Sequence, residues 1–186
     1  MKNKSKTKYA ILGILTIKPM SGYDIKKMID HSISHFWNES FGQLYPSLKT
    51  MENEGLISIS SENNGNKQKN IYSITANGIA VLNEWLAISP DTNQIRLEPL
   101  LKIFFGYNTD IDITIKHITD MKSNFQNQIS VLNIILKNFE QYKKTDNSHI
   151  YPLLTVQYGI FNYEANLKWT EYALETLEKL KKGDLK

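Results

Sequence analysis

The stretch that decides the fold runs over residues 41–57 and reads FGQLYPSLKTMENEGLI. Leu44, Leu48 and Met51 recur at the spacing of one helical face. Gly55 follows them where a residue in the left-handed conformation would end the helix. The stretch therefore predicts a helix with an apolar side turned inward and a polar side turned outward.

Pro46 interrupts this pattern and limits where the helix can begin. Proline has no N–H and crowds the carbonyl four residues earlier, here that of Gly42, so it is tolerated near a helix start and not in the interior. Ser40 is a candidate N-cap for a helix that begins at Phe41. On this interpretation Pro46 lies in the second turn and fixes the first turns of the helix.

Two further helices are expected before this stretch. Residues 8–17, KYAILGILTI, predict a helix, although so short an apolar run is also compatible with a buried strand. Ser21 and Asp24 have the spacing of a capping box, which predicts a second helix over residues 22–31. The stretch quoted first is then the third helix of the chain.

A hairpin and a fourth helix are expected after it. Residues 57–60 alternate between isoleucine and serine, as a half-buried strand does. The Asn-Gly pair at residues 64–65 predicts a tight turn, and residues 71–75 predict the returning strand. Thr75 is a candidate cap for a helix over residues 76–88.

This order of elements predicts a winged helix-turn-helix domain over residues 1–88, in which the third helix enters the DNA major groove and the hairpin forms the wing. Residues 89–97, SPDTNQIRL, are expected to be a linker. Residues 98–186 carry no strand signal. The predicted fold class is mainly α, with a winged helix-turn-helix domain followed by an antiparallel α-helical dimerisation domain.

Two long helices are expected in the second domain, one over residues 110–142 and one that begins at Pro152. Their apolar residues recur at heptad-like spacing. Because two antiparallel helices cover only part of such faces, a second copy of the chain is the expected partner. The residues expected at that dimer interface are Ile118, Phe125, Ile129, Leu132, Ile160, Tyr163, Leu167 and Trp169.

The composition limits the class of protein. The chain has 186 residues and no cysteine, which excludes disulfides, thiolate metal sites and cysteine nucleophiles. No run of about eighteen apolar residues is present, which predicts no membrane span and favours the cytoplasm. Residues 1–75 carry ten Lys and Arg against six Asp and Glu, whereas residues 76–186 carry twelve against thirteen. The N-terminal part is therefore expected to meet a polyanion, unless this imbalance is a chance feature of the surface.

The third helix supplies the main candidates for DNA contact. Gln43, Ser47 and Thr50 are expected on its outward face, with Tyr45 and Lys49 beside them. Glutamine suits adenine edges, hydroxyls suit bases or phosphate, and lysine suits phosphate or guanine. The alternative is an ordinary solvated face.

Four further residues are candidates for contact with the DNA backbone. Ser21 and Tyr23 stand at the start of the second helix, where hydroxyls and the helix N-terminus suit phosphate, although Tyr23 is equally suited to the core. Lys67 and Lys69 follow the hairpin tip and suit phosphate or the minor groove. Their alternative role is to protect a hairpin edge from pairing.

An enzyme is not indicated, and no catalytic residue, metal site or cofactor is predicted. His31, His35, His117 and His149 are scattered and lack the spacing of a zinc motif. The sequence also contains no glycine-rich phosphate loop.

Aromatic residues on both sides of the linker suggest a ligand site. Trp85, Phe104 and Phe105 are candidates to hold a flat aromatic effector between the two predicted domains. The alternative is that each of them packs in a core.

Three stretches together resemble the PadR family of bacterial transcriptional regulators: residues 9–29, 41–58 and 67–86. The residues that carry the resemblance are Leu44-Tyr45-Pro46, Glu52 with Glu54-Gly55-Leu56-Ile57, and Tyr72, Ile74, Thr75 and Gly78. Ile71 departs from the pattern, since members often have an aromatic or polar residue there. The helices after residue 97 resemble the longer C-terminal dimerisation domain of some members.

The resemblance implies a homodimeric regulator that binds double-stranded DNA at a near-palindromic operator and usually acts as a repressor. Some members release DNA when they bind phenolic acids or hydrophobic drugs, which agrees with a small aromatic effector. A few members are activators, so a ligand-independent activator of the same fold is the first alternative. A winged-helix protein-interaction module is the second.

Overall fold

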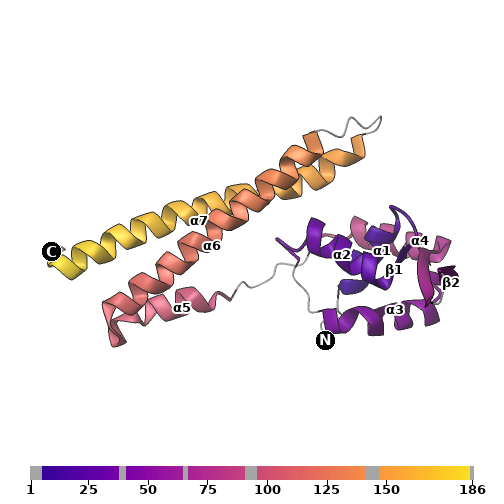
Figure 1. Cartoon of the computed structure of the whole chain (residues 1–186), viewed down its shortest axis with the longest axis horizontal. Helices are drawn as coiled ribbons and strands as arrows, with labels where there is room; N and C mark the ends of the chain where they lie inside the picture. The colour runs from indigo at the N-terminus through magenta and orange to yellow at the C-terminus, as the bar shows by residue number, and fades with distance from the viewer. Residues whose placement is uncertain (1–5, 38–40, 65–66, 91–95, 141–146, 185–186) are drawn as a thin grey trace. The chain divides into compact units, whose positions relative to one another are not determined.

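The computed structural model describes residues 6–37, 41–64, 67–90, 96–140 and 147–184. The chain divides into two compact units, Met1–Thr92 and Asn93–Lys186 (Figure 1). The elements of the first unit are α1 (Thr7–Leu15), β1 (Met20–Ser21), α2 (Gly22–Ser32), the 3-10 turn η1 (Phe41–Gln43), α3 (Leu44–Asn53), β2 (Ile57–Asn64), β3 (Lys67–Ile74) and α4 (Ala76–Ala87). The second unit contains α5 (Glu98–Phe104), η2 (Gly106–Asn108), α6 (Ile111–Glu140), η3 (Asn147–His149) and α7 (Ile150–Lys182). The fold is mainly helical and confirms the predicted class.

Helix α3 begins later than the sequence analysis expected. Residues Phe41–Gln43 form a 3-10 turn, and the α-helix starts at Leu44. Pro46 is therefore the third helical residue and not part of a second turn. In the first turn of an α-helix the N–H groups have no acceptor, so proline loses no hydrogen bond there. The proposed cap Ser40 lies outside the described residues.

The end of α3 is fixed by its glycine. Gly55 has φ +67°, a conformation that is strained for other residues. The Leu56 N–H donates to the Met51 carbonyl and the Gly55 N–H donates to the Glu52 carbonyl, each at 2.9 Å. These are the two hydrogen bonds of a Schellman motif. The motif turns the chain from α3 directly into β2.

The hairpin is joined to the end of α3 by Thr75. Its hydroxyl donates to the Gly55 carbonyl at 2.7 Å, and its N–H donates to the Leu56 carbonyl at 3.1 Å. The same hydroxyl accepts from the Gly78 N–H at 3.1 Å, which confirms the predicted cap of α4. One threonine thus holds together the end of α3, the end of β3 and the start of α4.

The sheet has the strand order β1-β3-β2, and all pairs are antiparallel. Strand β1 was not predicted, because two residues are too few to show a period. Asn64 pairs with Lys67, and these are the last described residues of the two strands. Residues 65–66, and with them part of the predicted Asn-Gly turn, lie outside the described residues.

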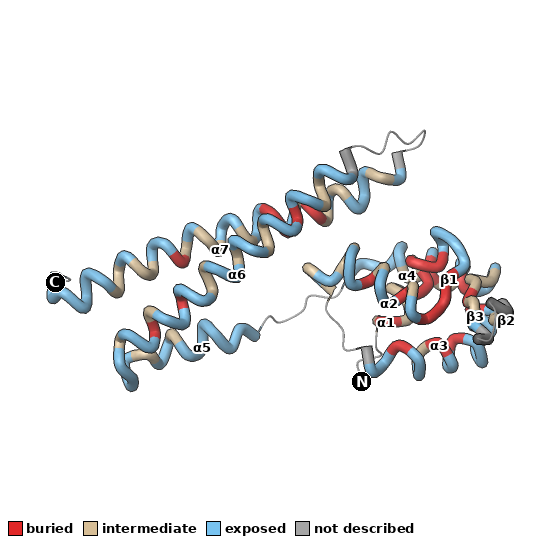
Figure 2. Tube along the Cα trace, viewed as in Figure 1, coloured by how far each residue is buried: buried red, intermediate tan, exposed pale blue. Residues whose placement is uncertain are grey.

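One continuous core fills the first unit. It contains fourteen buried apolar residues from α1, α2, α3, α4 and the sheet, and they appear as the red segments of Figure 2. Leu44, Leu48 and Met51 of α3 are each at most 3% exposed, as their spacing predicted. Residues Thr7–Leu15 are helical, which settles the choice between helix and strand for this segment.

In the second unit α6 and α7 pack side by side, as Figure 1 shows, and run antiparallel. Lys181 near the end of α7 pairs with Asp112 at the start of α6, and Lys122 pairs with Glu171 at 3.2 Å. These two ion pairs place the end of one helix beside the beginning of the other. Within the described ranges no helix combines the length and apolar character needed to cross a bilayer.

The core of this pair is small. Leu132, Val156 and Ile160 form its buried cluster, and Ile118 is 0% exposed. Ile118, Leu132 and Ile160 were expected at a dimer interface, but the chain's own helices cover them, so they have almost no surface left for a second copy. Phe125 of the same predicted set lies beside Tyr163, with ring centroids 6.0 Å apart. The remaining members, Ile129, Leu167 and Trp169, are half-buried.

The apolar surface that α7 leaves uncovered is a different stripe. Tyr151, Leu154, Tyr158, Phe161 and Tyr172 are between 56% and 74% exposed. They recur at three- and four-residue steps or multiples of them, and they lie on the side of α7 opposite the residues that face α6. We call these five residues the outer stripe of α7.

The expected linker, residues 89–97, lies between two helices of the structure. Helix α4 ends at Ala87 and helix α5 begins at Glu98. Most of the expected linker, residues 91–95, lies outside the described residues.

Candidate nucleic-acid interface

Helix α3 presents a polar side to solvent. Lys49 and Asn53 are one turn apart on the side opposite the buried residues, and both are exposed. The sequence analysis included Lys49 and missed Asn53. Its four-residue spacing from Lys49 would have placed it on the same side, and an asparagine amide can pair with an adenine edge.

Three of the predicted contact residues lie on one flank of α3. Gln43, Ser47 and Thr50 line a shallow depression of about 300 Å³ between α3 and the start of α1. The complete lining consists of Lys8, Gln43, Pro46, Ser47, Thr50, Met51 and Glu54. The Thr50 hydroxyl donates to the Pro46 carbonyl at 3.0 Å, so its oxygen remains an acceptor. Lys8 supplies the positive charge on this flank.

Tyr45 lies on the other flank of α3 and reaches helix α2. A Cβ added at Gly22 would come within 2.8 Å of the Tyr45 ring, so the ring rests directly on the backbone at the start of α2. Tyr45 is nevertheless 61% exposed. Burial raises the pKa of the Tyr72 phenol, and the neighbouring Tyr45 and Glu52 raise it further. Tyr45 therefore packs α3 against the start of α2.

At the start of α2 the two predicted residues behave differently. Ser21 is 4% exposed, and its hydroxyl donates to Asp24 Oδ2 at 2.5 Å while accepting from the Asp24 N–H at 3.2 Å. This is the predicted capping interaction, and it leaves Ser21 little surface for a phosphate. Tyr23 is 66% exposed and is not part of the core.

The wing lysine Lys69 forms an ion pair within the domain. Its Nζ lies 2.9 Å from Asp24 Oδ2. The hydrogen bond from Ser21 and the neighbouring Lys69 lower the pKa of the Asp24 carboxyl below its ordinary value of 3.8. Strand β1 pairs only with Ile71 and Tyr72 of β3, so Lys69 lies beyond the end of β1, and its alternative role at the hairpin edge stays open. Lys67 begins the same strand, and its side chain lies outside the described set.

The three aromatic residues proposed to hold an effector have separate surroundings. Trp85 is half-buried and stacks on Tyr9, with ring centroids 4.4 Å apart and an angle of 6° between the rings. It packs against the core of the first unit. Phe104 and Phe105 are 74% and 48% exposed and meet edge to face, with ring centroids 5.0 Å apart.

The acidic side chains and histidines of the described residues lie apart from one another. There, no three His, Asp or Glu side chains lie close enough together to hold a metal ion. His31 uses its Nδ1 on the Lys27 carbonyl at 2.7 Å, within its own helix.

Two family models match the chain in succession. Residues 11–84 match the transcriptional regulator PadR-like family. Residues 95–178 match the virulence activator alpha C-terminal region. The first match covers the winged helix, and the second covers α5, α6 and most of α7.

Similar proteins support the same assignment. The negative transcriptional regulator PadR of Bacillus subtilis (strain 168) is 36% identical over 100 residues, which are 53% of this chain and 55% of that protein. The crystal structure of the PadR-like transcriptional regulator BC1756 from Bacillus cereus is similar with a TM-score of 0.78 at 28% identity, over 93% of this chain and 98% of that one. The structure of Bacillus subtilis PadR in complex with operator DNA has a TM-score of 0.80 at 26% identity, over 93% and 99% of the two chains.

Proposed function

We propose that the chain, which carries a PadR-like domain at residues 11–84, is a transcriptional regulator of the PadR type that binds operator DNA as a homodimer and represses transcription. Helix α3 of each copy lies in a major groove, and the two grooves are about one helical turn, 34–36 Å, or a small multiple apart. Such a dimer selects near-palindromic operators, because its symmetry repeats the same contacts in both half-sites.

The observation that carries this proposal is the division of α3 into two sides. Leu48 and Met51 are 1% exposed and hold the helix against the core, while Lys49 and Asn53 face solvent. A helix held in this way can enter a groove without losing its packing. The DNA-bound structure of Bacillus subtilis PadR, which is similar over almost the whole chain, supports the same use of the fold.

The homodimer is proposed from the outer stripe of α7. Five large apolar side chains there have no cover within one chain, among the residues that the structure describes. A contiguous apolar patch of this kind commonly marks a protein interface. A second copy of the same stripe is self-complementary, as a twofold interface requires.

The proposal is tested by DNA binding in solution. The full chain is titrated into a labelled duplex from just upstream of its own gene, and fluorescence anisotropy is read at several salt concentrations. A sequence-selective complex of two chains per duplex is expected. Absence of any anisotropy change with all duplexes at low salt would contradict the proposal that the protein binds DNA.

Lys49→Ala gives a sharper test of the contact face. Loss of one phosphate contact from each copy should weaken binding to all duplexes and reduce the slope of log K against log salt by about one per copy, or about two for the dimer. Lys116→Ala, which removes an exposed lysine from α6, is the matched control and should leave the slope unchanged. An unchanged slope in Lys49→Ala would exclude a phosphate contact at this residue.

Activation is the second candidate mode. The match of residues 95–178 to the virulence activator alpha C-terminal region favours it. Transcription in vitro from the bound promoter separates the two modes, since a repressor lowers the transcript level and an activator raises it. The same assay, repeated with aromatic carboxylic acids and cationic aromatic compounds, tests whether an effector is needed.

A further inference from the structure

Asp24 lies where the start of α2 meets the wing strand β3. The pairing of β1 with β3 ends at Ser21 and Ile71. Beyond this last pair, in the direction of the hairpin tip, Asp24 Oδ2 lies 2.9 Å from Lys69 Nζ. The ion pair therefore continues the contact between the start of α2 and the hairpin after the strand pairing has stopped.

The Asp24 carboxylate is held in place by its surroundings. The Ser21 hydroxyl donates to Oδ2 at 2.5 Å, and Lys69 pairs with the same oxygen. Asp24 also stands in the first turn of α2, where the partial positive charge of the helix N-terminus favours a carboxylate. The hydrogen bond from Ser21 and the neighbouring Lys69 lower the pKa of the Asp24 carboxyl, so it is ionised at neutral pH. A fixed anion thus occupies the place where the sequence analysis expected a DNA phosphate.

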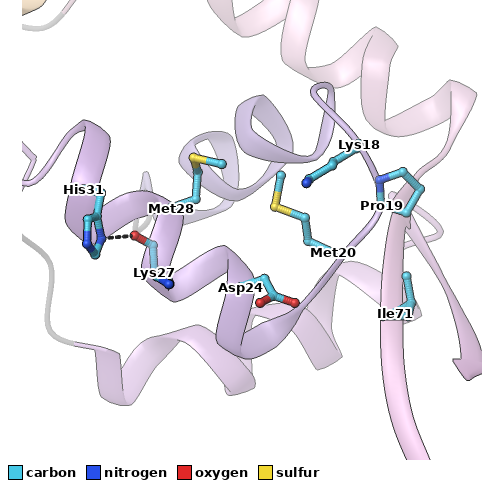
Figure 3. Close-up of a pocket in the computed structure, with 8 residues that line it drawn as sticks. All are labelled: Lys18, Pro19, Met20, Asp24, Lys27, Met28, His31 and Ile71. Atoms are coloured by element: carbon cyan, nitrogen blue, oxygen red, sulfur yellow. Dashed lines mark hydrogen bonds between the residues drawn. The ribbon is translucent and has the colours of Figure 1, made fainter. Parts of the chain in front are cut away.

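The surroundings of Asp24 are otherwise positive. Asp24 lines a pocket of about 450 Å³ between α2, β1 and β3 (Figure 3). Lys18 and Lys27 line the same pocket, and among its described lining residues only Asp24 is acidic. The complete lining consists of Lys18, Pro19, Met20, Asp24, Lys27, Met28, His31 and Ile71. One carboxylate therefore opposes the charges of Lys18 and Lys27 as well as that of Lys69.

A lysine that is paired with a carboxylate adds little to sequence-independent DNA binding. Affinity of that kind comes from lysines and arginines that neutralise phosphates and release counterions. A phosphate that approaches Lys69 also approaches the charge of Asp24, which repels it. Both side chains are about 45% exposed, so the duplex can reach Lys69 and its carboxylate partner together.

We propose that Asp24 is a specificity-determining residue, whose carboxylate occupies Lys69 and keeps this lysine from DNA phosphates. This inference rests on the proposed function. The operator complex loses little by it, because base contacts of α3 fix the register of the protein on the operator. A complex with unrelated DNA loses more, because it depends on phosphate contacts. The carboxylate therefore raises the ratio of operator affinity to affinity for other DNA.

Asp24→Asn in the full chain tests this role. Asparagine keeps an oxygen that accepts from Ser21 and removes the charge. Fluorescence anisotropy should show binding to a duplex of unrelated sequence at least about 5-fold tighter, with the slope of log K against log salt steeper by about one per copy. Binding to the duplex from upstream of its own gene should tighten less, so the ratio of the two affinities should fall at least about 3-fold.

Two further variants identify the cause. Asp30→Asn removes the same charge from an exposed position of α2 and should leave the slope and the ratio as in the parent. Asp24→Asn/Lys69→Gln should lose most of the gain, because the lysine that becomes available is removed as well. An equal gain in Asp24→Asn and Asp30→Asn would reduce the effect to net charge and overturn the proposal. Weaker binding of Asp24→Asn to both duplexes would also overturn it.

A polyanion other than DNA separates failure of this inference from failure of the proposed function. On a heparin column Asp24→Asn should elute at higher salt than Asp30→Asn, although the two variants have the same net charge. This order of elution in a protein that binds no duplex would support the pairing role of Asp24 and contradict the proposed function. Equal elution of the two variants would overturn the inference even in a protein that binds its operator.

Discussion

The two units of the chain have almost equal length and very different interiors. Residues Met1–Thr92 bury fourteen apolar residues in one core, whereas the described cluster of the α6–α7 pair contains three. The apolar residues of the second unit are not fewer; many of them are exposed on α5 and α7. We therefore expect the first unit to be stable alone and the second to gain stability on association, as the proposed homodimer requires.

The largest expected effect concerns the core of the first unit. Leu48→Ala should lower the free energy of unfolding by about 2–5 kcal/mol, because it removes a fully buried leucine and leaves a cavity. The measurement is urea unfolding of the full chain, followed by near-UV absorption of the aromatic side chains in this unit. The loss should not depend on protein concentration, and a concentration-dependent loss would contradict the independence of this unit.

The next effect concerns association of the second unit. Phe161→Asp places a charge in the outer stripe of α7 and should raise the dimer dissociation constant at least about 30-fold, which corresponds to ~2 kcal/mol. Sedimentation velocity over a dilution series measures this constant. Asn124→Asp adds the same charge at an exposed position of α6 and should leave the dimer intact. Dimers that survive Phe161→Asp would require another interface.

A smaller effect is expected at the end of α3. Gly55→Ala forces alanine to φ +67° and should cost about 1–2 kcal/mol. Gly13→Ala is the matched control, because a Cβ at this helical position in α1 meets no atom within 4 Å, and it should stabilise by up to ~1 kcal/mol. Thermal unfolding of both variants measures the difference. Equal melting temperatures of the two variants would show that the turn after α3 changes its conformation to accommodate alanine.

The smallest effect is expected for the Asp24–Lys69 pair. Its side chains are about 45% exposed, so Asp24→Asn should cost less than ~1 kcal/mol at pH 7. Because folding lowers the pKa of Asp24 below 3.8, its contribution is present above that pH and is lost as the pH falls through the folded-state pKa. The two proteins should therefore converge in stability only when the pH falls below the lowered pKa of Asp24 in the folded state.

Urea midpoints at a series of pH values measure this convergence. Asp30→Asn removes a charge from the same helix at a position away from Lys69 and serves as the control. A difference between parent and Asp24→Asn that grows at low pH would contradict the direction of the pKa shift.

The fold of the first unit could be predicted because its signals are local. Helical spacing, the Ser21 and Thr75 caps and the left-handed Gly55 each act within a few residues. The two predicted strands pair as β2 and β3, with Asn64 opposite Lys67, and residues 65–66 between them lie outside the described residues.

The candidate sites were harder to predict, because helical spacing shows which residues share a face of a helix but not which other element packs against that face. Helix α7 carries two apolar stripes of the same period, and only the packing of α6 decides that Ile160 is covered and Phe161 is left exposed. Ser21 was a candidate phosphate contact because of its hydroxyl, but this hydroxyl caps α2 through its hydrogen bonds with Asp24. Lys18 and Lys27 join one pocket only through the fold, since nothing in their spacing connects them to Ile71.

The hydrogen bonds from Thr75 to the backbone of Gly55 and Leu56 have a consequence for how a duplex is recognised. In the proposed DNA complex they hold α3, in the major groove, at a fixed distance from the β2–β3 hairpin, which we expect to reach the neighbouring minor groove. Duplexes whose minor groove already fits that distance should be bound without bending energy. We therefore expect part of the selectivity to come from base pairs that no side chain touches.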